Sequence, residues 1–237
     1  MPPDIASTIH HYRPALLASR WFGALPSALQ DALLKAAQLR TLSTGERLFS
    51  RGEAFDGIYC VVNGALRVGS CNEAGKEALL AMVEPFNWIG EIALIDGLAR
   101  THDATAEGAC SVLRIPAPAL AQILDEHPQW WRCFALQLTQ KMRFAFIGIE
   151  EAALLPAPQR IARRLVLIAE GYGEFAGRSR RVLSLPQEQL ANMLDLSRQT
   201  INQSLRQFEA QGLIRLSYRE LEILDLERLR RAGEQNG

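Results

Sequence analysis

One short segment combines a glycine with acidic, basic and hydroxyl side chains that suit an anionic ligand. Gly90 permits close approach of a ligand to the backbone, and the run Glu91-Ile92-Ala93-Leu94 can form a helical turn whose N–H groups face an anion. Arg100 and the Thr101 hydroxyl then supply donors to a phosphate, while Glu91 accepts from sugar hydroxyls. The alternative is that Glu91 and Arg100 simply pair with each other.

A second segment, from Ser197 to Glu209, has polar residues of the kind that read bases in DNA. Ser197 is a good helix N-cap, and Ile201, Leu205 and Phe208 follow on one apolar face. The opposite face carries Arg198, Gln199, Asn202, Gln203 and Arg206. Such donors and acceptors suit base edges in the major groove. A three-helix packing unit with a polar outer face is the alternative.

Other kinds of chemistry find little support in the sequence. Cys60, Cys71, Cys110 and Cys133 form no CxxC pair and have no neighbouring histidine, so we expect reduced thiols rather than a zinc or iron–sulfur site. A nucleophile with a base and an orienting residue is not evident, and His102-Asp103 alone gives little support to a cupin-like metalloenzyme. The sequence therefore predicts no enzyme, no metal and no covalently bound cofactor.

Short strands separated by turns are expected to position the anion-binding segment. Two helices are predicted first, over Arg13 to Trp21 and over Ser27 to Ala37. Apolar segments typical of strands then occupy 47–49, 57–62, 65–68, 78–83 and 111–115. Asn63-Gly64 predicts a two-residue hairpin between two of them. Even spacing of this kind predicts a small antiparallel barrel or roll.

A long helix is predicted from Pro128 to about Leu155, after a shorter one from Ala117 to Asp125. Apolar residues of the long helix alternate spacings of four and three, at Trp131, Ala135, Leu138, Met142, Ala145, Ile149 and Ala152. This apolar seam favours pairing with a second copy of the chain, while Phe134 and other apolar residues cover the roll. The alternative is one buried helix within a monomer.

The C-terminal part is predicted to hold the base-reading helix in a helix-turn-helix with a wing. Pro156-Ala157-Pro158 ends the long helix and marks a domain boundary. The next elements are a helix from Arg160 to Glu170, a polar loop with Arg178, Arg180 and Arg181, a helix over 187–194 and the turn Asp195-Leu196-Ser197. Beyond the base-reading helix and Gly212, segments 213–216 and 221–224 predict a hairpin around Tyr218-Arg219, before a last helix over 226–231.

Charge is distributed unevenly, although 26 basic and 26 acidic residues cancel. Residues 1–159 carry 13 basic and 16 acidic side chains, and residues 160–237 carry 13 and 10. All basic residues of the second part are arginines, which suit bidentate contacts to phosphate and guanine, although composition bias would also explain them. We therefore expect DNA affinity to depend on dimerisation and a few placed contacts.

Neither a membrane span nor a secretory leader is visible. Glu150 and Glu151 interrupt the longest apolar stretches, which fall short of the roughly 18 residues that a span needs. The N-terminus lacks a basic region followed by an apolar one. We expect a cytoplasmic protein without a membrane partner.

The order of these motifs resembles the Crp/Fnr family of bacterial transcription regulators. The segment from Gly90 to Thr101 is similar to the phosphate-binding cassette of cyclic-nucleotide-binding domains, and Ser197-Arg198-Gln199-Thr200 follows a dimer helix, as in the family. The resemblance covers about residues 25–231. It implies an α+β fold with three successive parts. These are a jelly-roll-like effector-binding β-roll domain over 13–127, a dimerisation helix over 128–155 and a winged helix-turn-helix domain over 156–237.

The resemblance also implies roles for individual residues. Glu91 would contact the ribose 2′-hydroxyl, while Arg100, Thr101 and the backbone around Gly90, Ile92 and Ala93 would hold the cyclic phosphate. DNA contacts would come from Ser197, Arg198, Gln199, Thr200, Asn202, Gln203 and Arg206.

Two positions depart from the family's catabolite activator. Ala145-Phe146 stands where that protein contacts adenine through Thr-Ser, so those contacts are missing. Phe146 is a candidate for stacking on a base, although dimer packing is the simpler role. Gln199 replaces a glutamate, and glutamine favours adenine where glutamate favours cytosine, so the operator should differ there.

We therefore expect a homodimeric transcription regulator, of activator type. Its roll would bind cyclic AMP or a related cyclic nucleotide and reposition the two helix-turn-helix units on a near-palindromic operator, with RNA polymerase as a further partner. A regulator of the same family with another effector, or with none, is the main alternative. A haem or iron–sulfur version lacks ligands in this sequence, and the base-reading helix disfavours a module that controls a protein partner.

Overall fold

The computed structural model describes residues 5–71, 77–174, 179–217 and 220–234. Two compact units contain these residues: the described residues up to 142, except 77–79, form the first unit, and 77–79 with the described residues from 143 onward form the second. The predicted hairpin centre Tyr218-Arg219 and Arg178 of the polar loop lie outside the described residues.

Helices α1 (Ile5–Leu17), α2 (Arg20–Gly23) and α3 (Ser27–Ala36) open the first unit. The prediction of one helix from Arg13 to Trp21 is wrong, because the chain leaves helical geometry between α1 and α2. Ser19 there has an extended backbone, and its hydroxyl donates to the carbonyl oxygen of Leu16 at 2.8 Å. The third helix agrees with the prediction and buries its apolar face.

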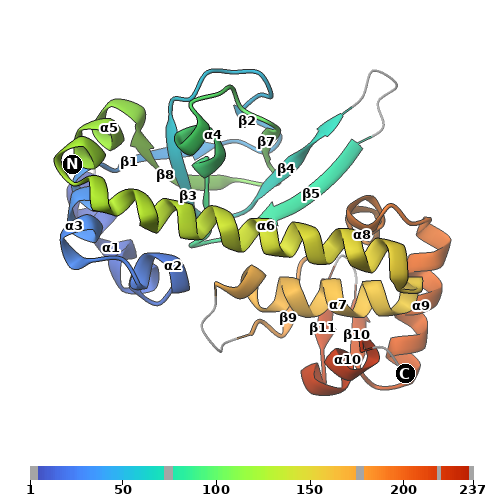
Figure 1. Cartoon of the computed structure of the whole chain (residues 1–237). Coiled ribbons are helices and arrows are strands. Elements are labelled where there is room, and N and C mark those ends of the chain that lie inside the picture. Colours follow the sequence, from blue (N-terminus) through green and yellow to red (C-terminus); the bar gives the residue numbers. More distant parts are fainter. Residues whose placement is uncertain (1–4, 72–76, 175–178, 218–219, 235–237) are drawn as a thin grey trace. The chain divides into compact units, whose positions relative to one another are not determined.

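Eight strands between Gln38 and Pro116 form two antiparallel sheets, which confirms the predicted roll (Figure 1). They are β1 (Gln38–Leu42), β2 (Arg47–Phe49), β3 (Gly57–Asn63), β4 (Leu66–Cys71), β5 (Glu77–Val83), β6 (Trp88–Ile89), β7 (Asp103–Ala106) and β8 (Cys110–Pro116). The sheet orders are β1-β8-β3-β6 and β2-β7-β4-β5. The sequence prediction missed β1, β6 and β7.

Strand β3 is buried on both faces, which explains its unbroken apolar run. Tyr59 and Val61 pack into the core between the sheets, whereas Ile58 and Cys60 pack into a second core with the N-terminal helices. Side chains alternate between the faces of a strand, so both faces must be apolar when both are covered.

The predicted two-residue hairpin at Asn63-Gly64 is wrong, because β3 and β4 lie in different sheets. Gly64 has φ +74°, but Asn63 does not share the positive φ that a type I′ turn needs at both positions. A Cβ atom at residue 64 would lie 2.4 Å from the carbonyl oxygen of Ala109. Glycine here allows the chain to pass closely over β8 as it crosses between the sheets.

Helices α4 (Glu91–Asp96), α5 (Ala117–Glu126) and α6 (Trp131–Leu154) follow, with a 3-10 turn over Pro128–Trp130 before α6. Of the residues of α6, Phe134 and Gln137 are buried. Phe134 packs against Trp21 with ring centroids 5.5 Å apart, as expected for the face that covers the roll. The remaining seam residues are exposed or partly exposed, which contradicts the alternative of a helix buried within a monomer.

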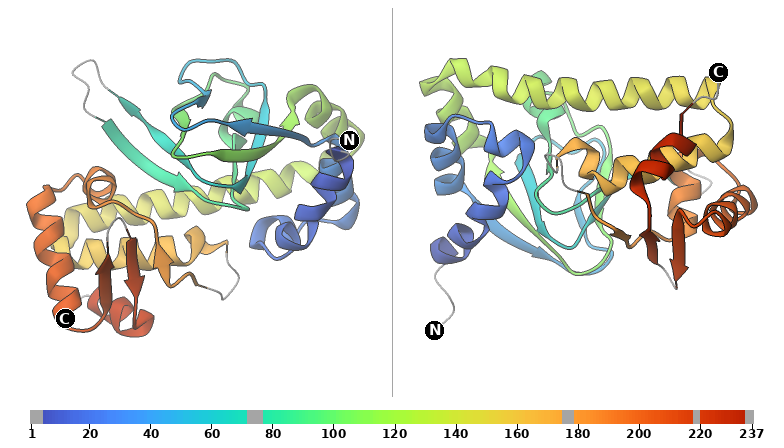
Figure 2. Two further views of the ribbon diagram at one scale, coloured as in Figure 1. Left: turned by 180° about the vertical axis from the view of Figure 1, so that it is seen from behind. Right: turned by 90° about the horizontal axis from the view of Figure 1, so that it is seen from below.

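The second unit forms the predicted helix-turn-helix with a small sheet (Figure 2). Its elements are α7 (Ala157–Ala169), a 3-10 turn (Gly171–Gly173), β9 (Val182–Leu183), α8 (Gln187–Leu194), α9 (Arg198–Ala210), β10 (Ile214–Ser217), β11 (Glu220–Ile223) and α10 (Leu226–Ala232). The sheet order is β10-β11-β9. Helix α7 begins before the predicted Arg160, because Pro158 lies in its first turn, where no backbone donor is needed.

Among the helices that the structure describes, none is both long enough and apolar enough to cross a membrane.

Candidate functional site

Gly90 begins the predicted helical turn and leaves room for Arg100. The turn is helix α4, and Gly90 at its N-cap has φ 106° and ψ 0°, which is left-handed backbone that favours glycine. A Cβ atom at residue 90 would lie 2.9 Å from Nη1 of Arg100 and 3.1 Å from the carbonyl oxygen of Gly57. Arg100 occupies the space beside Gly90, and the approach of a ligand to the backbone of residue 90 stays a prediction.

Arg100 is a buried cation with unused donors. Its side chain is 2% exposed, and Nη2 donates to Oδ1 of Asp56 and to the carbonyl oxygen of Gly57, both at 2.6 Å. Nε and Nη1 are buried and have no hydrogen-bond partner among the described residues. A buried guanidinium with open donors fits an anion as its further partner.

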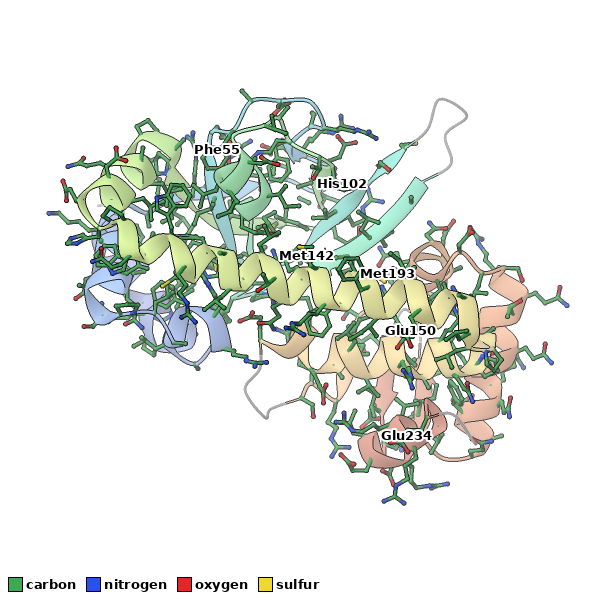
Figure 3. All side chains as sticks on the ribbon, viewed as in Figure 1. Phe55, His102, Met142, Glu150, Met193 and Glu234 are labelled. Atoms are coloured by element: carbon green, nitrogen blue, oxygen red, sulfur yellow. The ribbon has the colours of Figure 1, made fainter. Side chains whose placement is uncertain are left out.

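Three aromatic rings surround the Arg100 guanidinium. Its Cζ atom lies 4.3 Å from the ring centroid of Phe49, 5.1 Å from that of Phe55 and 5.6 Å from that of Tyr59. Phe55, in the loop before β3, is labelled in Figure 3. Cation–π contacts of this kind stabilise the charge and restrict its movement.

Asp56 is the counter-ion of Arg100 and has further donors around it. The Tyr59 hydroxyl donates to Oδ2, and Nη2 of Arg114 lies 3.2 Å from the same oxygen. Burial raises the pKa of Asp56, but the hydrogen bonds from Tyr59 and Arg100 and the charges of Arg100 and Arg114 outweigh burial and hold it below its usual value. Burial, followed by the adjacent Asp56, raises the pKa of Tyr59 to about 12.

Glu91, the predicted sugar contact, pairs with the long helix. It is 4% exposed, and its Oε2 accepts from Nζ of Lys141 at 2.9 Å. Lys141 also donates to the carbonyl oxygen of Trp88 at 2.7 Å, and Gln137 donates to that oxygen at 3.3 Å. The alternative that Glu91 and Arg100 pair with each other is therefore wrong, since each has another partner.

The remaining predicted effector residues differ in exposure. Thr101 is exposed, and its hydroxyl is 2.9 Å from Nδ1 of His102. Ala93 is buried, whereas Ile92 is exposed. Phe146 is exposed and belongs to the second unit, so its stacking on a base stays a prediction.

The helix-turn-helix has the local geometry that the sequence predicts. Ser197 caps α9, where its Oγ accepts from the backbone N–H of Thr200 at 3.1 Å. Asp195 has φ 48° and makes the sharp turn after α8. Ile201 and Phe208 are buried in the core of the unit, so the polar face of α9 is left outward.

An open hollow on this outward face collects the polar residues of the predicted DNA-reading surface. It is lined by Gln187, Arg198, Gln199, Asn202, Gln203 and Arg206. Nδ2 of Asn202 donates to Oε1 of Gln187 at 3.1 Å, and Nε of Arg206 donates to Oδ1 of Asn202 at 2.9 Å. Arg198 pairs with Glu188 of α8. The surface thus joins two helices through hydrogen-bonded side chains.

Sequence reasoning missed the partners of the predicted effector residues in the roll and of the polar residues on α9. Asp56 is an acidic residue directly before a buried strand, and Lys141 is a lone lysine on a helix with a long apolar seam. Gln187 lies in the first turn of α8, where a helix-turn-helix can approach DNA. The sequence positions of these three residues were the available signals. None of them identifies the side chain that the residue contacts until the fold is known.

Two family models match consecutive parts of the chain. The cyclic nucleotide-binding domain matches residues 39–127, and the Crp-like helix-turn-helix domain matches residues 159–232. The first match contains Asp56, Glu91 and Arg100, and the second contains the whole outward face of α9.

Curated relatives and solved structures agree with these matches. The CRP-like cAMP-activated global transcriptional regulator of Mycobacterium tuberculosis is 30% identical over 210 residues, which is 88% of this chain and 93% of that protein. The transcriptional activator protein Anr of Pseudomonas protegens is 30% identical over 78% of this chain and 76% of its own length. The structure of FixK2 from Bradyrhizobium japonicum has a TM-score of 0.74 at 19% identity, covers 85% of this chain and 99% of its own, and shows the same fold.

Proposed function

The chain belongs to the Crp/Fnr family of transcription regulators, and on this premise we propose that its roll binds a cyclic nucleotide, with cyclic AMP as the first candidate. The effector function is assigned to residues 13–127, dimerisation to 128–155 and DNA binding to 156–237. The name of the Mycobacterium tuberculosis relative, a cAMP-activated regulator, supports this choice of effector.

The observation that carries the proposal is the buried Arg100 guanidinium. Its Nη1 lies against the open side of Gly90, and both Nε and Nη1 lack a partner among the described residues. A cyclic phosphate would supply the missing acceptors. Glu91, which keeps Oε1 outside its bond to Lys141, would accept from the ribose 2′-hydroxyl.

The base of the effector would be recognised differently from the adenine of the family's catabolite activator. Ala145 and Phe146 provide no hydroxyl where that protein has Thr-Ser. The proposed recognition therefore depends on the phosphate and the ribose, through Arg100 and Glu91.

The DNA-bound form is proposed to be a homodimer that pairs through α6. The exposed Met142 and Ile149 of the seam support this, because apolar side chains at helical spacing favour burial against a partner. Two copies of α9 would meet half-sites about 34 Å apart on a near-palindromic operator. RNA polymerase is the expected further partner at promoters.

Regulation requires that the effector bind one state of the dimer better than the other. The proposed effector acts by stabilising the dimer in which both α9 helices fit successive major grooves. Its binding in the roll would be transmitted through α6, to which the Lys141–Glu91 pair connects the effector site.

Calorimetric titration with cyclic AMP, cyclic GMP and cyclic di-GMP tests the effector. We expect the wild-type protein to bind cyclic AMP and Arg100→Leu to lose that binding, because the phosphate loses its buried donor. Arg47→Leu, at an exposed arginine of β2, is the matched control and should bind as the wild type does. Folding of each variant is checked by circular dichroism. Unchanged binding by a folded Arg100→Leu protein would contradict the assignment of the phosphate site.

A selection of bound sequences from random duplexes tests the DNA surface. Gln199→Ala combined with Gln203→Ala should relax the preference at the bases that these residues read, by about 1–3 kcal/mol for each lost bidentate contact. Gln207→Ala, at another exposed glutamine of α9, is the control and should leave the preference unchanged. An unaltered preference in the double variant would remove these residues from the reading surface.

A further inference from the structure

We propose that Asp56 is a positioning residue for the effector. Asp56 holds the Arg100 guanidinium so that Nε and Nη1 stay available to the anion. Tyr59 and Arg114 hold Asp56 in turn. The proposal rests on the proposed function, and it deepens the assignment of the effector site. Asp56 lies in the loop before β3 and was not among the residues that the sequence singled out.

One end of the guanidinium is fixed by protein atoms alone. Nη2 of Arg100 meets Oδ1 of Asp56 and the carbonyl oxygen of Gly57, both at 2.6 Å. The aromatic rings of Phe49 and Tyr59 lie beside the Cζ atom and restrict rotation of the group. Arg100 therefore has a defined orientation before any ligand arrives, which lowers the entropic cost of binding.

The charge of Arg100 requires such a partner. A buried guanidinium without a counter-ion is strongly disfavoured, and at 2% side-chain exposure Arg100 cannot turn to water instead. Asp56 is itself 42% exposed, so it stands at the edge of the roll and bonds inward to Arg100.

Asp56 is held on its other oxygen as well. Oδ2 accepts from the Tyr59 hydroxyl and faces Nη2 of Arg114 at 3.2 Å, and Arg114 also donates to the backbone oxygen of Asp56 at 2.9 Å. One carboxylate thus lies between two guanidinium groups. This group of three side chains keeps an excess positive charge that still attracts an anionic ligand.

The geometry favours positioning over competition with the ligand. Asp56 uses Nη2, whereas the nitrogens without partners are Nε and Nη1. An anion can therefore bind Arg100 while the bond to Asp56 remains. Asp56 would act like the residues around metal sites that hydrogen-bond to a binding side chain and fix its orientation.

The test measures cyclic AMP binding by the full-length protein with Asp56→Asn, which keeps an acceptor oxygen but removes the charge. We expect binding about tenfold to a hundredfold weaker, as for the loss of a charged hydrogen bond. Tyr59→Phe, which keeps the ring and removes the hydroxyl, should weaken binding in the same direction by a smaller factor. Asp125→Asn, at an exposed aspartate of α5, is the control.

A double-mutant cycle separates positioning from a general loss of stability. In the Arg100→Gln background, Asp56→Asn should have no further effect on the affinity, because Asp56 acts through Arg100. An equal loss in both backgrounds would overturn the proposal, and so would unchanged or tighter binding by Asp56→Asn alone. Should Asp56→Asn fail to fold, Tyr59→Phe with the same cycle carries the test.

Wild-type binding distinguishes the two levels of inference. If the wild type binds no cyclic nucleotide, the proposed effector fails and the role of Asp56 fails with it. If the wild type binds and both Asp56→Asn and Tyr59→Phe equal it, only the role of Asp56 is overturned.

Discussion

Tyr59 connects the interior of the roll to Asp56, at the proposed effector site, through a single hydroxyl group. Its ring is fully buried between the sheets, and its hydroxyl donates to Asp56. Ionisation of Tyr59 would place a second negative charge beside the Asp56 carboxylate in a buried position. The burial of the ring and the adjacent Asp56 therefore both oppose ionisation of Tyr59.

We predict that one tyrosine of the native protein ionises near pH 12, where burial and Asp56 raise the pKa of Tyr59. A folded-state pKa raised above the unfolded value of about 10 contributes stability that is present below pH 10 and is lost as the pH rises to 12. Tyrosinate absorbance measured against pH checks this. The late-titrating tyrosine should be missing in Tyr59→Phe, and a wild type whose tyrosines all ionise near pH 10 would contradict the prediction.

The Ser197 cap supports the orientation of α9. Replacement by alanine leaves the N–H of Thr200 without its acceptor, so Ser197→Ala should lower the unfolding free energy of the second unit by about 1 kcal/mol. Denaturant unfolding measures the loss. Ser184→Ala, at an exposed serine of the same unit, is the control, and equal stability of the two variants would show that the cap has no energetic role.

At this scale the sequence identified side chains but not their partners. Glu91, Arg100 and the polar face of α9 are recognisable because residue type and local spacing carry their chemistry. Asp56 and Lys141 are distant from them in the chain, and the pairs arise only when β3 and α6 pack against the effector segment. The alternative reading, in which Glu91 pairs with Arg100, is wrong because each of the two side chains has a partner that is distant in the sequence.

Among the elements, α6 has an apolar surface that its own chain leaves uncovered. Ile149 of the seam is 66% exposed, and Ile147, on the opposite side of the helix, is 46% exposed. The two isoleucines allow the same substitution to be compared on two faces of one helix.

We predict that Ile149→Glu converts the proposed dimer to monomer, because each copy would bury an unpaired carboxylate in the proposed α6 interface. The dissociation constant of the dimer should rise at least about a hundredfold, as several kcal/mol of charge burial implies. Sedimentation velocity over a concentration series measures it. Ile147→Glu should remain dimeric, and identical behaviour of the two variants would place the interface elsewhere.

Strand prediction succeeded for segments with an apolar pattern and failed for segments that are strands only because a neighbouring strand pairs with them. The predicted segments from 47–49 to 111–115 all contain strands, whereas β1, β6 and β7 are short or polar and are strands because a neighbour pairs with them. The Asn63-Gly64 turn shows the same limit. Its residues predicted a local hairpin, but β4 pairs in a different sheet from β3, so the chain crosses between the sheets at this turn.

For the whole molecule, the proposed function requires that effector binding and operator binding be linked in both directions. If cyclic AMP strengthens operator binding by some factor, the operator strengthens cyclic AMP binding by the same factor, and about fivefold to 150-fold is typical. Arg100→Leu should remove the linkage while leaving DNA binding without effector intact, because Arg100 belongs to the roll unit alone.

Two measurements test this linkage. Calorimetry gives the affinity for cyclic AMP with and without an operator duplex, and fluorescence anisotropy gives the affinity for the duplex with and without cyclic AMP. The two factors should agree. A factor of one on both sides would mean that the effector binds without repositioning the DNA-reading helices, and the mechanism would have to be abandoned.

The order of the parts was predictable at this scale because each motif is local. The cassette, the seam and the helix-turn-helix each occupy a continuous segment, and the two family matches contain the cassette and the helix-turn-helix. The formal net charge of zero conceals a balance between acidic and arginine-rich parts, so total charge alone would have argued against a DNA partner.

The complete burial of β3 also has a kinetic consequence. Its backbone is hydrogen-bonded to β8 on one side and to β6 on the other, and every residue of 57–62 is buried. Amide protons in such a strand exchange with deuterium only when the whole roll opens. Gly57, whose carbonyl oxygen accepts from Arg100, begins this strand. The proposed effector site is therefore attached to a strand whose amides should exchange slowly, and it should keep its shape for as long as the roll stays folded.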